Sequence, residues 1–191
     1  MSQNPRIGIF GGSFDPPHRA HAAAILWALQ SGEIDRVLMI PAARHAFGKQ
    51  HTASFEQRAS MCHLAVAEFA PGLVEVSRIE GERTGVSYSI DTVEELARLH
   101  PEASFRLLVG TDILDDLGAW HRGGELLRLA PPLVIPRIVE HSAHPERGVR
   151  PGALPMLSST TIRERAARSE DISLLVPSRV ARFIADQGLY R

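Results

Sequence analysis

Short apolar runs alternate with amphipathic stretches along most of this chain. Each run is bounded by turn residues, and each amphipathic stretch repeats its apolar positions with helical spacing. The pattern predicts strands at 6–10, 36–41, 73–77, 105–110 and 132–136. It predicts helices at 20–32, 54–69, 89–101, 121–129, 158–168 and 177–188. This strand–helix alternation predicts an α/β fold with a doubly wound parallel sheet and helices on both of its faces.

Residues with known preferences mark several helix ends. Ser54 is placed as an N-cap, and Gln57 follows three residues later, as in a capping box. Gly32 should stop the first helix, while Pro177 and Gly188 bracket the last one. Ligands of parallel sheets bind outside the carboxyl ends of the strands, and the loop after the first strand lies at that edge.

Two connections are longer and less regular. Residues 41–53 are rich in basic and small residues, and residues 136–156 contain four prolines and two glycines. Either connection is a mobile lid or a surface loop.

Composition narrows the function classes. The chain has 191 residues, 44% hydrophobic and 23% charged, which predicts a single globular domain over 1–191. Its net charge of −1 gives no overall field for nucleic acid or an anionic membrane. Cys62, the only cysteine, lies in an apolar stretch and is interpreted as a buried free thiol. With no signal pattern and no apolar run long enough to cross a bilayer, a cytoplasmic location is expected.

The stretch "RIGIFGGSFDPPHRAH" carries the first candidate chemistry. Gly11 and Gly12 follow an apolar strand, and His18 and His21 open a helix. The glycines make an ordinary tight turn or let the backbone approach a ligand closely. Histidines three residues apart can donate to phosphate oxygens, act as acid or base, or bind a metal. A zinc site needs a third ligand and no HExxH motif is present; His141 and His144 repeat the spacing in a loop that has no cysteine.

Five blocks of this sequence resemble one known family in the same order. They are "GGSFDPPHRAH", "TGVSYSIDTVEEL", "LLVGTDILDDLGAWHRGGELL", "LSSTTIRERA" and "QGLYR". Together they resemble the bacterial nicotinate mononucleotide adenylyltransferases, members of the nucleotidyltransferase superfamily with a Rossmann-like fold. The chain departs from the family pattern at Ala20, at Ser89, and at "RHAFGKQ", where the family has a proline-proline-histidine-lysine loop.

The resemblance implies adenylyl transfer from ATP to a pyridine mononucleotide, with pyrophosphate leaving. His18, His21, Lys49 and Arg163 would be the catalytic residues. ATP would be held by Gly11, Gly12, Ser13, Phe14, His18, His21, Gly110, Asp112, Ser159, Thr160 and Arg163. Mg²⁺ is expected to arrive with ATP, without a metal site built by the protein. Taken alone, the block at 158–165 is better interpreted as an N-cap followed by a solvated charged face; the other blocks shift the interpretation to phosphate binding.

A second group of residues would hold the pyridine nucleotide: Asp15, Lys49, Tyr88, Ser89, Trp120 and His121. Trp120 is the candidate stacking platform, and backbone N–H groups near Tyr88 would take the nicotinate carboxylate. Core packing is the alternative for Trp120. Lys49 is the only lysine among the 21 lysine and arginine residues. Either its compact charge on a flexible stem follows moving phosphates, or its presence is due to chance. With Arg44 and His45 nearby, its loop is expected to close over the phosphates.

Four alternatives stay open from sequence. The acceptor could instead be nicotinamide mononucleotide or another phosphate such as phosphopantetheine. The chain could be a nucleotide-binding regulator without catalysis, or a metal-dependent hydrolase. No nucleic-acid or membrane partner is expected, and a homo-oligomer is possible.

Overall fold

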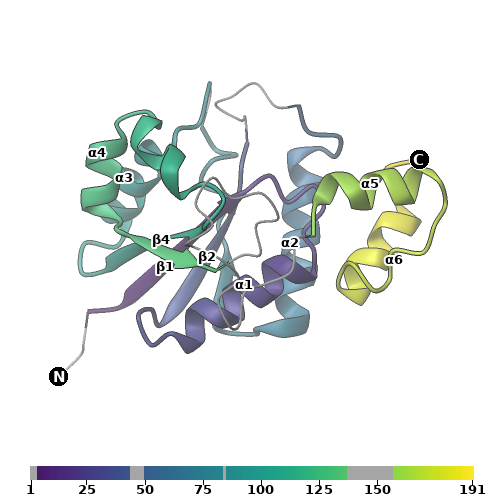
Figure 1. Cartoon of the computed structure of the whole chain (residues 1–191), viewed down its shortest axis with the longest axis horizontal. Coiled ribbons are helices and arrows are strands. Elements are labelled where there is room, and N and C mark those ends of the chain that lie inside the picture. Colours follow the sequence, from purple (N-terminus) through teal and green to yellow (C-terminus); the bar gives the residue numbers. More distant parts are fainter. Residues whose placement is uncertain (1–3, 44–49, 84, 137–156) are drawn as a thin grey trace.

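The computed structural model describes residues 4–43, 50–83, 85–136 and 157–191. Its centre is a five-stranded parallel sheet with the order β3-β2-β1-β4-β5 (Figure 1). The strands are β1 (Arg6–Gly12), β2 (Arg36–Pro41), β3 (Val74–Val76), β4 (Ser104–Gly110) and β5 (Pro132–Ile135). The predicted α/β class with a doubly wound parallel sheet is confirmed.

Helices cover both faces of this sheet. They are α1 (Arg19–Gln30), α2 (Phe55–Phe69), α3 (Ser89–Leu99), α4 (Gly123–Leu129), α5 (Ser159–Ala167), α6 (Ser178–Asp186) and the 3₁₀ helix η1 (Leu114–Ala119). Because side chains alternate along a strand, Ile7 and Ile9 of β1 pack with α3 and α4, whereas Phe10 packs with α1 and α2. The apolar strand runs are therefore buried on both sides, as parallel sheets require.

The order of the strands fixes where a ligand crevice can form. From β1 the chain moves outward through β2 to β3, and then returns to the other side of β1 to form β4 and β5. The direction of winding thus reverses between β1 and β4. At such a switch point the two neighbouring loops leave the sheet in opposite directions and open a crevice. The loops after Gly12 and Gly110 flank this point.

Most predicted element ends are confirmed. The Ser54 hydroxyl accepts from the Gln57 N–H at 3.2 Å, and the Gln57 side chain accepts from the Ser54 N–H at 2.9 Å. Gly32 and Gly188 lie just beyond α1 and α6 with φ of +73° and +60°. The fourth helix starts at Gly123 rather than at residue 121, because Arg122 has a left-handed backbone (φ +51°).

The 3₁₀ helix η1 was not predicted. Its sequence, "LDDLGA", has two acidic residues and a glycine and is too short to show a helical period. Only Leu117 is buried in it, where it packs in the core beside α3 and α4. The helix is therefore held by tertiary packing, which a local pattern does not reveal.

The last two helices form a third apolar cluster with α2. Ile162 of α5 and Val180 and Ile184 of α6 pack with Met61 and Ala65 of α2. Figure 1 shows α5 and α6 (yellow-green to yellow) beside α2, at the opposite end of the molecule from α3 and α4. This packing places the start of α5 within reach of the loop after β1.

Cys62 lies inside the core between α2 and the sheet and is fully buried. Burial raises the pKa of its thiol, which therefore stays protonated at neutral pH. The predicted buried free thiol is confirmed.

Among the described segments, no helix combines the length and apolar character that a bilayer crossing requires.

Candidate active site

The two histidines meet where β1 gives way to α1. His18 is the N-cap residue of α1, with an extended backbone (φ −139°, ψ 173°), and His21 follows in the first turn. Their imidazole rings stack with centroids 3.6 Å apart and planes inclined by 16°. His18 is 3% exposed. The start of the helix thus places both rings together at the carboxyl edge of the sheet.

A hydrogen bond defines the donor nitrogen of His21. The backbone N–H of His18 donates to Nδ1 of His21 at 3.1 Å. A ring nitrogen that accepts a hydrogen bond carries no proton, so a neutral His21 holds its proton on Nε2. The first turn of α1 therefore sets up Nε2 of His21 as a hydrogen-bond donor, which suits a phosphate oxygen.

Phe14 packs against the His21 ring on the side of the protein core. Its side chain is 2% exposed, its φ is +48°, and its ring meets the His21 ring edge-on at 5.0 Å. A Cβ added to Gly12 would lie 3.0 Å from the tip of the Phe14 ring. Gly12 is therefore needed for packing within the protein. The predicted contact of Phe14 with ATP can involve only its backbone, because its side chain is in the core.

Gly11 differs from Gly12. It is exposed, its φ lies outside the left-handed region, and a Cβ added there would meet no atom of the described residues within 4 Å. The fold itself therefore does not require glycine at this position. A ligand that approaches the backbone closely is the remaining physical reason for it, which favours the second sequence interpretation over a tight turn.

The start of α5 is joined to the loop after β1. The Ser159 hydroxyl donates to the Pro16 carbonyl at 2.9 Å, which leaves its backbone N–H as the group that can face a phosphate. Ser158 is the N-cap, and its hydroxyl accepts from the Thr161 N–H at 3.1 Å. Two blocks that lie about 140 residues apart in the sequence are thus in direct contact, with a helix N-terminus favourable to anions between them.

Arg163 lies in the same contact. Its Nη1 donates to the Asp15 carbonyl at 2.8 Å, and its Nη2 donates to the Thr160 hydroxyl at 3.3 Å. These bonds use two of the five N–H donors of a guanidinium. Arg163 is half-buried, and its further donors can serve a phosphate. The structure therefore brings Arg163, Ser159 and Thr160 beside the loop at 13–17, which leads from β1 to the histidine pair and is called the histidine loop below.

The segment after β4 lies on the other side of the switch point. The Thr111 N–H donates to the Ile135 carbonyl at 3.2 Å, and the Ile113 N–H donates to the Gly110 carbonyl at 3.2 Å. Asp112 is exposed between them. It follows β4, the strand that pairs with β1, and this position suits the predicted contact with ATP.

The candidate residues for the pyridine nucleotide form a separate group. Tyr88 is the N-cap of α3, and its ring lies 4.2 Å from that of His121. Trp120 ends η1 and packs partly against the core beside α3. Core contact therefore accounts for part of its surface, and the exposed part is available to a ligand. The group includes Ser89, the first residue of α3.

Ion pairs hold this group together. The Arg122 guanidinium binds Glu94 of α3 through two hydrogen bonds of 3.1 and 2.6 Å, and it also binds Glu125 of α4 at 2.6 Å. These carboxylates raise the pKa of Arg122, which is charged in any case. The bonds join the segment after η1 to both helices, so Trp120 and His121 are held against the start of α3.

Asp15 is a buried residue of the loop between β1 and α1. It is 3% exposed, and its carboxylate accepts from the N–H groups of Thr52 and Ala53 at 2.6 and 3.1 Å and from the Tyr190 hydroxyl at 2.7 Å. The carboxylate of Asp15 is thus bonded within the protein. Its predicted contact with the pyridine nucleotide stays a prediction.

Sequence reasoning missed two buried charged residues. Arg58 is 1% exposed, and its guanidinium donates to the Ser13 carbonyl at 2.7 Å. Glu80 accepts from the Ala43 N–H at 3.3 Å and from the Thr92 hydroxyl at 3.1 Å, and it joins the end of β2 to α3. Burial raises the pKa of Glu80. An arginine within the apolar pattern of α2 was an available signal for the first; nothing in the local sequence marks the second.

Several predicted residues lie outside the described part of the chain. They are Lys49 with its neighbours Arg44 and His45, and the spaced pair His141 and His144. The possible closure of the loops at 41–53 and 136–156 concerns residues 44–49 and 137–156, which lie there too.

Within the described ranges, no group of three or more histidine, cysteine, aspartate or glutamate side chains is arranged to hold a metal ion.

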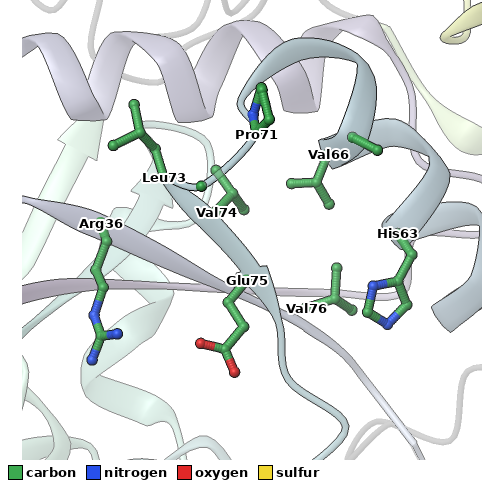
Figure 2. Close-up of a pocket in the computed structure, with 10 residues that line it drawn as sticks. Arg36, His63, Val66, Pro71, Leu73, Val74, Glu75 and Val76 are labelled. Atoms are coloured by element: carbon green, nitrogen blue, oxygen red, sulfur yellow. The ribbon is translucent and has the colours of Figure 1, made fainter.

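A pocket of about 450 Å³ lies elsewhere, at the outer edge of the sheet. Figure 2 shows its lining from β3, from α2 and from the turn between them, with Arg36 from β2. Arg36 begins β2, whereas the histidine pair follows the end of β1. This pocket is therefore not part of the candidate active site.

Comparison with known proteins supports the sequence resemblance. The family model described as cytidylyltransferase-like matches residues 9–165. A probable nicotinate-nucleotide adenylyltransferase of Anaeromyxobacter dehalogenans (strain 2CP-C) is 43% identical over the whole of both chains. The chain belongs to the cytidylyltransferase-like family and is related to nicotinate-nucleotide adenylyltransferases such as this one. Another such relative, from Myxococcus xanthus, is 35% identical and covers 97% of this chain and 94% of its own.

Solved structures of nicotinic acid mononucleotide adenylyltransferases share the fold. A Plasmodium falciparum nicotinic acid mononucleotide adenylyltransferase matches with a TM-score of 0.79 at 19% identity, over 97% of each chain, in a complex with NaAD. The same enzyme complexed with APC matches with a TM-score of 0.78 at 18% identity, also over 97% of each chain. At such identities the match supports the Rossmann-like nucleotidyltransferase fold.

Proposed function

We propose that this chain transfers the adenylyl group of ATP to nicotinate mononucleotide, forming nicotinate adenine dinucleotide and pyrophosphate. The observation that carries the proposal is the stacked His18–His21 pair at the switch point of the sheet, joined by hydrogen bonds to the start of α5. The relatives' names agree with it. One nucleotidyltransferase domain over residues 1–191 would perform the reaction.

In this reaction a phosphate oxygen of the mononucleotide attacks the α-phosphorus of ATP. A new P–O bond forms while the bond to the leaving pyrophosphate breaks, so no covalent intermediate with the protein is needed. The task of the protein is to align two anions and to offset negative charge. His18 and the Nε2–H of His21 would donate to the α-phosphate, and Arg163 with the start of α5 would hold the leaving phosphates. The substrate is taken to be MgATP, whose metal reduces the charge on the phosphates.

The acceptor is predicted from the chemistry at the start of α3. Nicotinate and nicotinamide differ only in carboxylate against amide. The first N–H groups of a helix have no partner within the helix, so they suit a group that accepts at both oxygens. An amide would present an NH₂ to these donors, and an unpaired buried polar group costs about 1–3 kcal/mol. We expect kcat/KM to be at least about tenfold higher for nicotinate mononucleotide than for nicotinamide mononucleotide.

This preference is measured by following pyrophosphate release with ATP, Mg²⁺ and each acceptor in turn, phosphopantetheine included. Trp120→Ala should raise the KM of the pyridine nucleotide more than that of ATP, because the indole is the predicted stacking surface. Equal kcat/KM for the two mononucleotides would overturn the specificity while leaving adenylyl transfer intact. Activity with phosphopantetheine alone would overturn the acceptor class.

The two glycines after β1 provide a paired test of close approach by ATP. Gly11→Ala should leave the melting temperature unchanged or slightly raised, because the new Cβ meets nothing and the unfolded chain loses freedom. It should nevertheless raise the KM of ATP about tenfold, an order-of-magnitude expectation for a displaced substrate. Gly12→Ala should lower the melting temperature, since the Phe14 ring must move. Thermal denaturation and initial rates measure both effects, and full activity in Gly11→Ala would show that ATP does not approach this backbone.

A further inference from the structure

The loop that carries His18 includes a buried charge. Residues 13–17 join β1 to α1, and within them Asp15 is 3% exposed. A buried carboxylate is stable only when donors surround it. The donors of Asp15 come from two distant parts of the chain: the N–H groups of Thr52 and Ala53 before α2, and the Tyr190 hydroxyl near the end of the sequence.

Arg58 binds the same loop from within the protein. Its Nη1 donates to the Ser13 carbonyl at 2.7 Å, and its Nε donates to the Ala53 carbonyl at 3.3 Å. Burial lowers the pKa of this guanidinium, while the charge of Asp15 acts in the opposite direction. Ser13 and Asp15 are therefore both held by groups that belong to, or directly precede, α2.

Tyr190 is part of the apolar cluster that α5 and α6 form with α2. It is 7% exposed, has φ of +64°, and packs with Ile162 and the apolar face of α6. The Leu189 N–H donates to the Ile184 carbonyl at 3.0 Å, which fixes the chain just before it. Burial and the bond to Asp15 raise the pKa of Tyr190, so its hydroxyl keeps its proton and donates at 2.7 Å.

Hydrogen bonds thus hold the histidine loop from two sides. On one side Arg163 binds the Asp15 carbonyl and Ser159 binds the Pro16 carbonyl. On the other side Tyr190 and the 52–53 backbone bind the Asp15 carboxylate. Pro16 and Pro17 are the only residues between Asp15 and His18, so a shift of Asp15 is passed to the imidazole.

We propose that Tyr190 is a positioning residue for the reaction: by donating to Asp15 it holds the 13–17 loop so that His18 and His21 meet the α-phosphate. The inference rests on the proposed function. Losing the hydroxyl leaves Asp15 with one donor fewer and loosens the loop. A displacement of the order of 1 Å at a reacting group can reduce the rate about 100-fold, so we expect kcat to fall roughly tenfold or more. The KM of the acceptor should change less than kcat, because the Asp15 carboxylate is bonded within the protein and Tyr190 packs in a different cluster from Tyr88 and Trp120, the residues expected to hold the pyridine ring.

Tyr190→Phe is the test variant, since it removes one oxygen and keeps the buried ring. Val180→Ala is its matched control: it removes apolar contacts from the same cluster, and Val180 is not among the groups bonded to Asp15. Rates are measured at a temperature at which denaturant titration shows both variants to be folded. We expect Tyr190→Phe to lose kcat and Val180→Ala to keep it, even if Val180→Ala is the less stable protein.

Amide hydrogen exchange supplies a readout that does not depend on activity. The N–H groups of Thr52 and Ala53 share the Asp15 carboxylate, so they should exchange faster in Tyr190→Phe than in Val180→Ala. Unchanged kcat in Tyr190→Phe, or an equal loss of kcat in the control, would overturn the proposal. An inactive wild-type protein would instead contradict the proposed function, so the two failures are distinguishable.

Discussion

Replacing His18 with alanine should lower kcat about 100-fold or more, the usual scale for the loss of one donor to a transition state. His18 is the N-cap of α1, its side chain belongs to a capping box with His21, and its ring is stacked on that of His21 at the carboxyl edge of the sheet. We expect the main loss in turnover, with a smaller cost to stability of about 1 kcal/mol for the lost cap. Steady-state kinetics with ATP and nicotinate mononucleotide, together with thermal denaturation, measure the two quantities.

Two further variants sharpen this test. His18→Asn keeps a residue that favours the N-cap position, so it should fold at least as well as His18→Ala and lose as much activity. His63→Ala removes an exposed histidine of α2 and should behave as wild type. Full activity in both His18 variants would remove this residue from the mechanism. The double change of His18 and His21 should cost less than the product of the single losses, because the rings act together.

Replacing Arg163 with alanine should lower kcat/KM for ATP by about 10- to 100-fold, corresponding to about 1.4–2.7 kcal/mol of transition-state stabilisation. The guanidinium donates to the Asp15 carbonyl at 2.8 Å. In the proposed reaction its further donors would bind the leaving phosphates. The same loss is expected for pyrophosphate when the reaction is measured in reverse. The KM of nicotinate mononucleotide should be nearly unchanged.

The control for Arg163 lies two residues further along the same helix. Arg165 is exposed and pairs with Glu170 at 3.8 Å, so Arg165→Ala should keep full activity. Arg163→Lys preserves the charge but not the two-pronged geometry, and it should recover only part of the loss. A defect confined to the KM of the acceptor would mean that Arg163 serves the other ligand.

The sequence predicted the sheet because its strands obey a simple local rule. Runs such as "RVLMIP" are apolar on both faces, and the helices between them carry their own caps, such as Ser54 with Gln57. The order β3-β2-β1-β4-β5 follows from long-range packing and was not predicted from these patterns. Arg122 in a left-handed conformation and the 3₁₀ helix η1 likewise depend on tertiary contacts, since Arg122 is held by Glu94 and Glu125.

The candidate site could be predicted where its residues are close in sequence. His18 and His21 are three residues apart, and the geometry of a helix N-terminus, with His18 as N-cap and His21 in the first turn, brings them together. The contact of Arg163 with Asp15 spans 148 positions, and that of Tyr190 with Asp15 spans 175. No local pattern encodes such contacts. Arg58 and Glu80 were missed for the same reason, because their importance arises from burial beside segments that are distant in sequence.

The most direct test of the central claim is the stoichiometry of the reaction. The purified protein is incubated with MgATP and nicotinate mononucleotide, and the dinucleotide and pyrophosphate are quantified over time, with reactions lacking the acceptor run in parallel. We predict that the two products form in equal amounts and that neither forms without the acceptor. Pyrophosphate or phosphate release that does not need the acceptor, or the absence of dinucleotide when both substrates are present, would contradict adenylyl transfer by this chain.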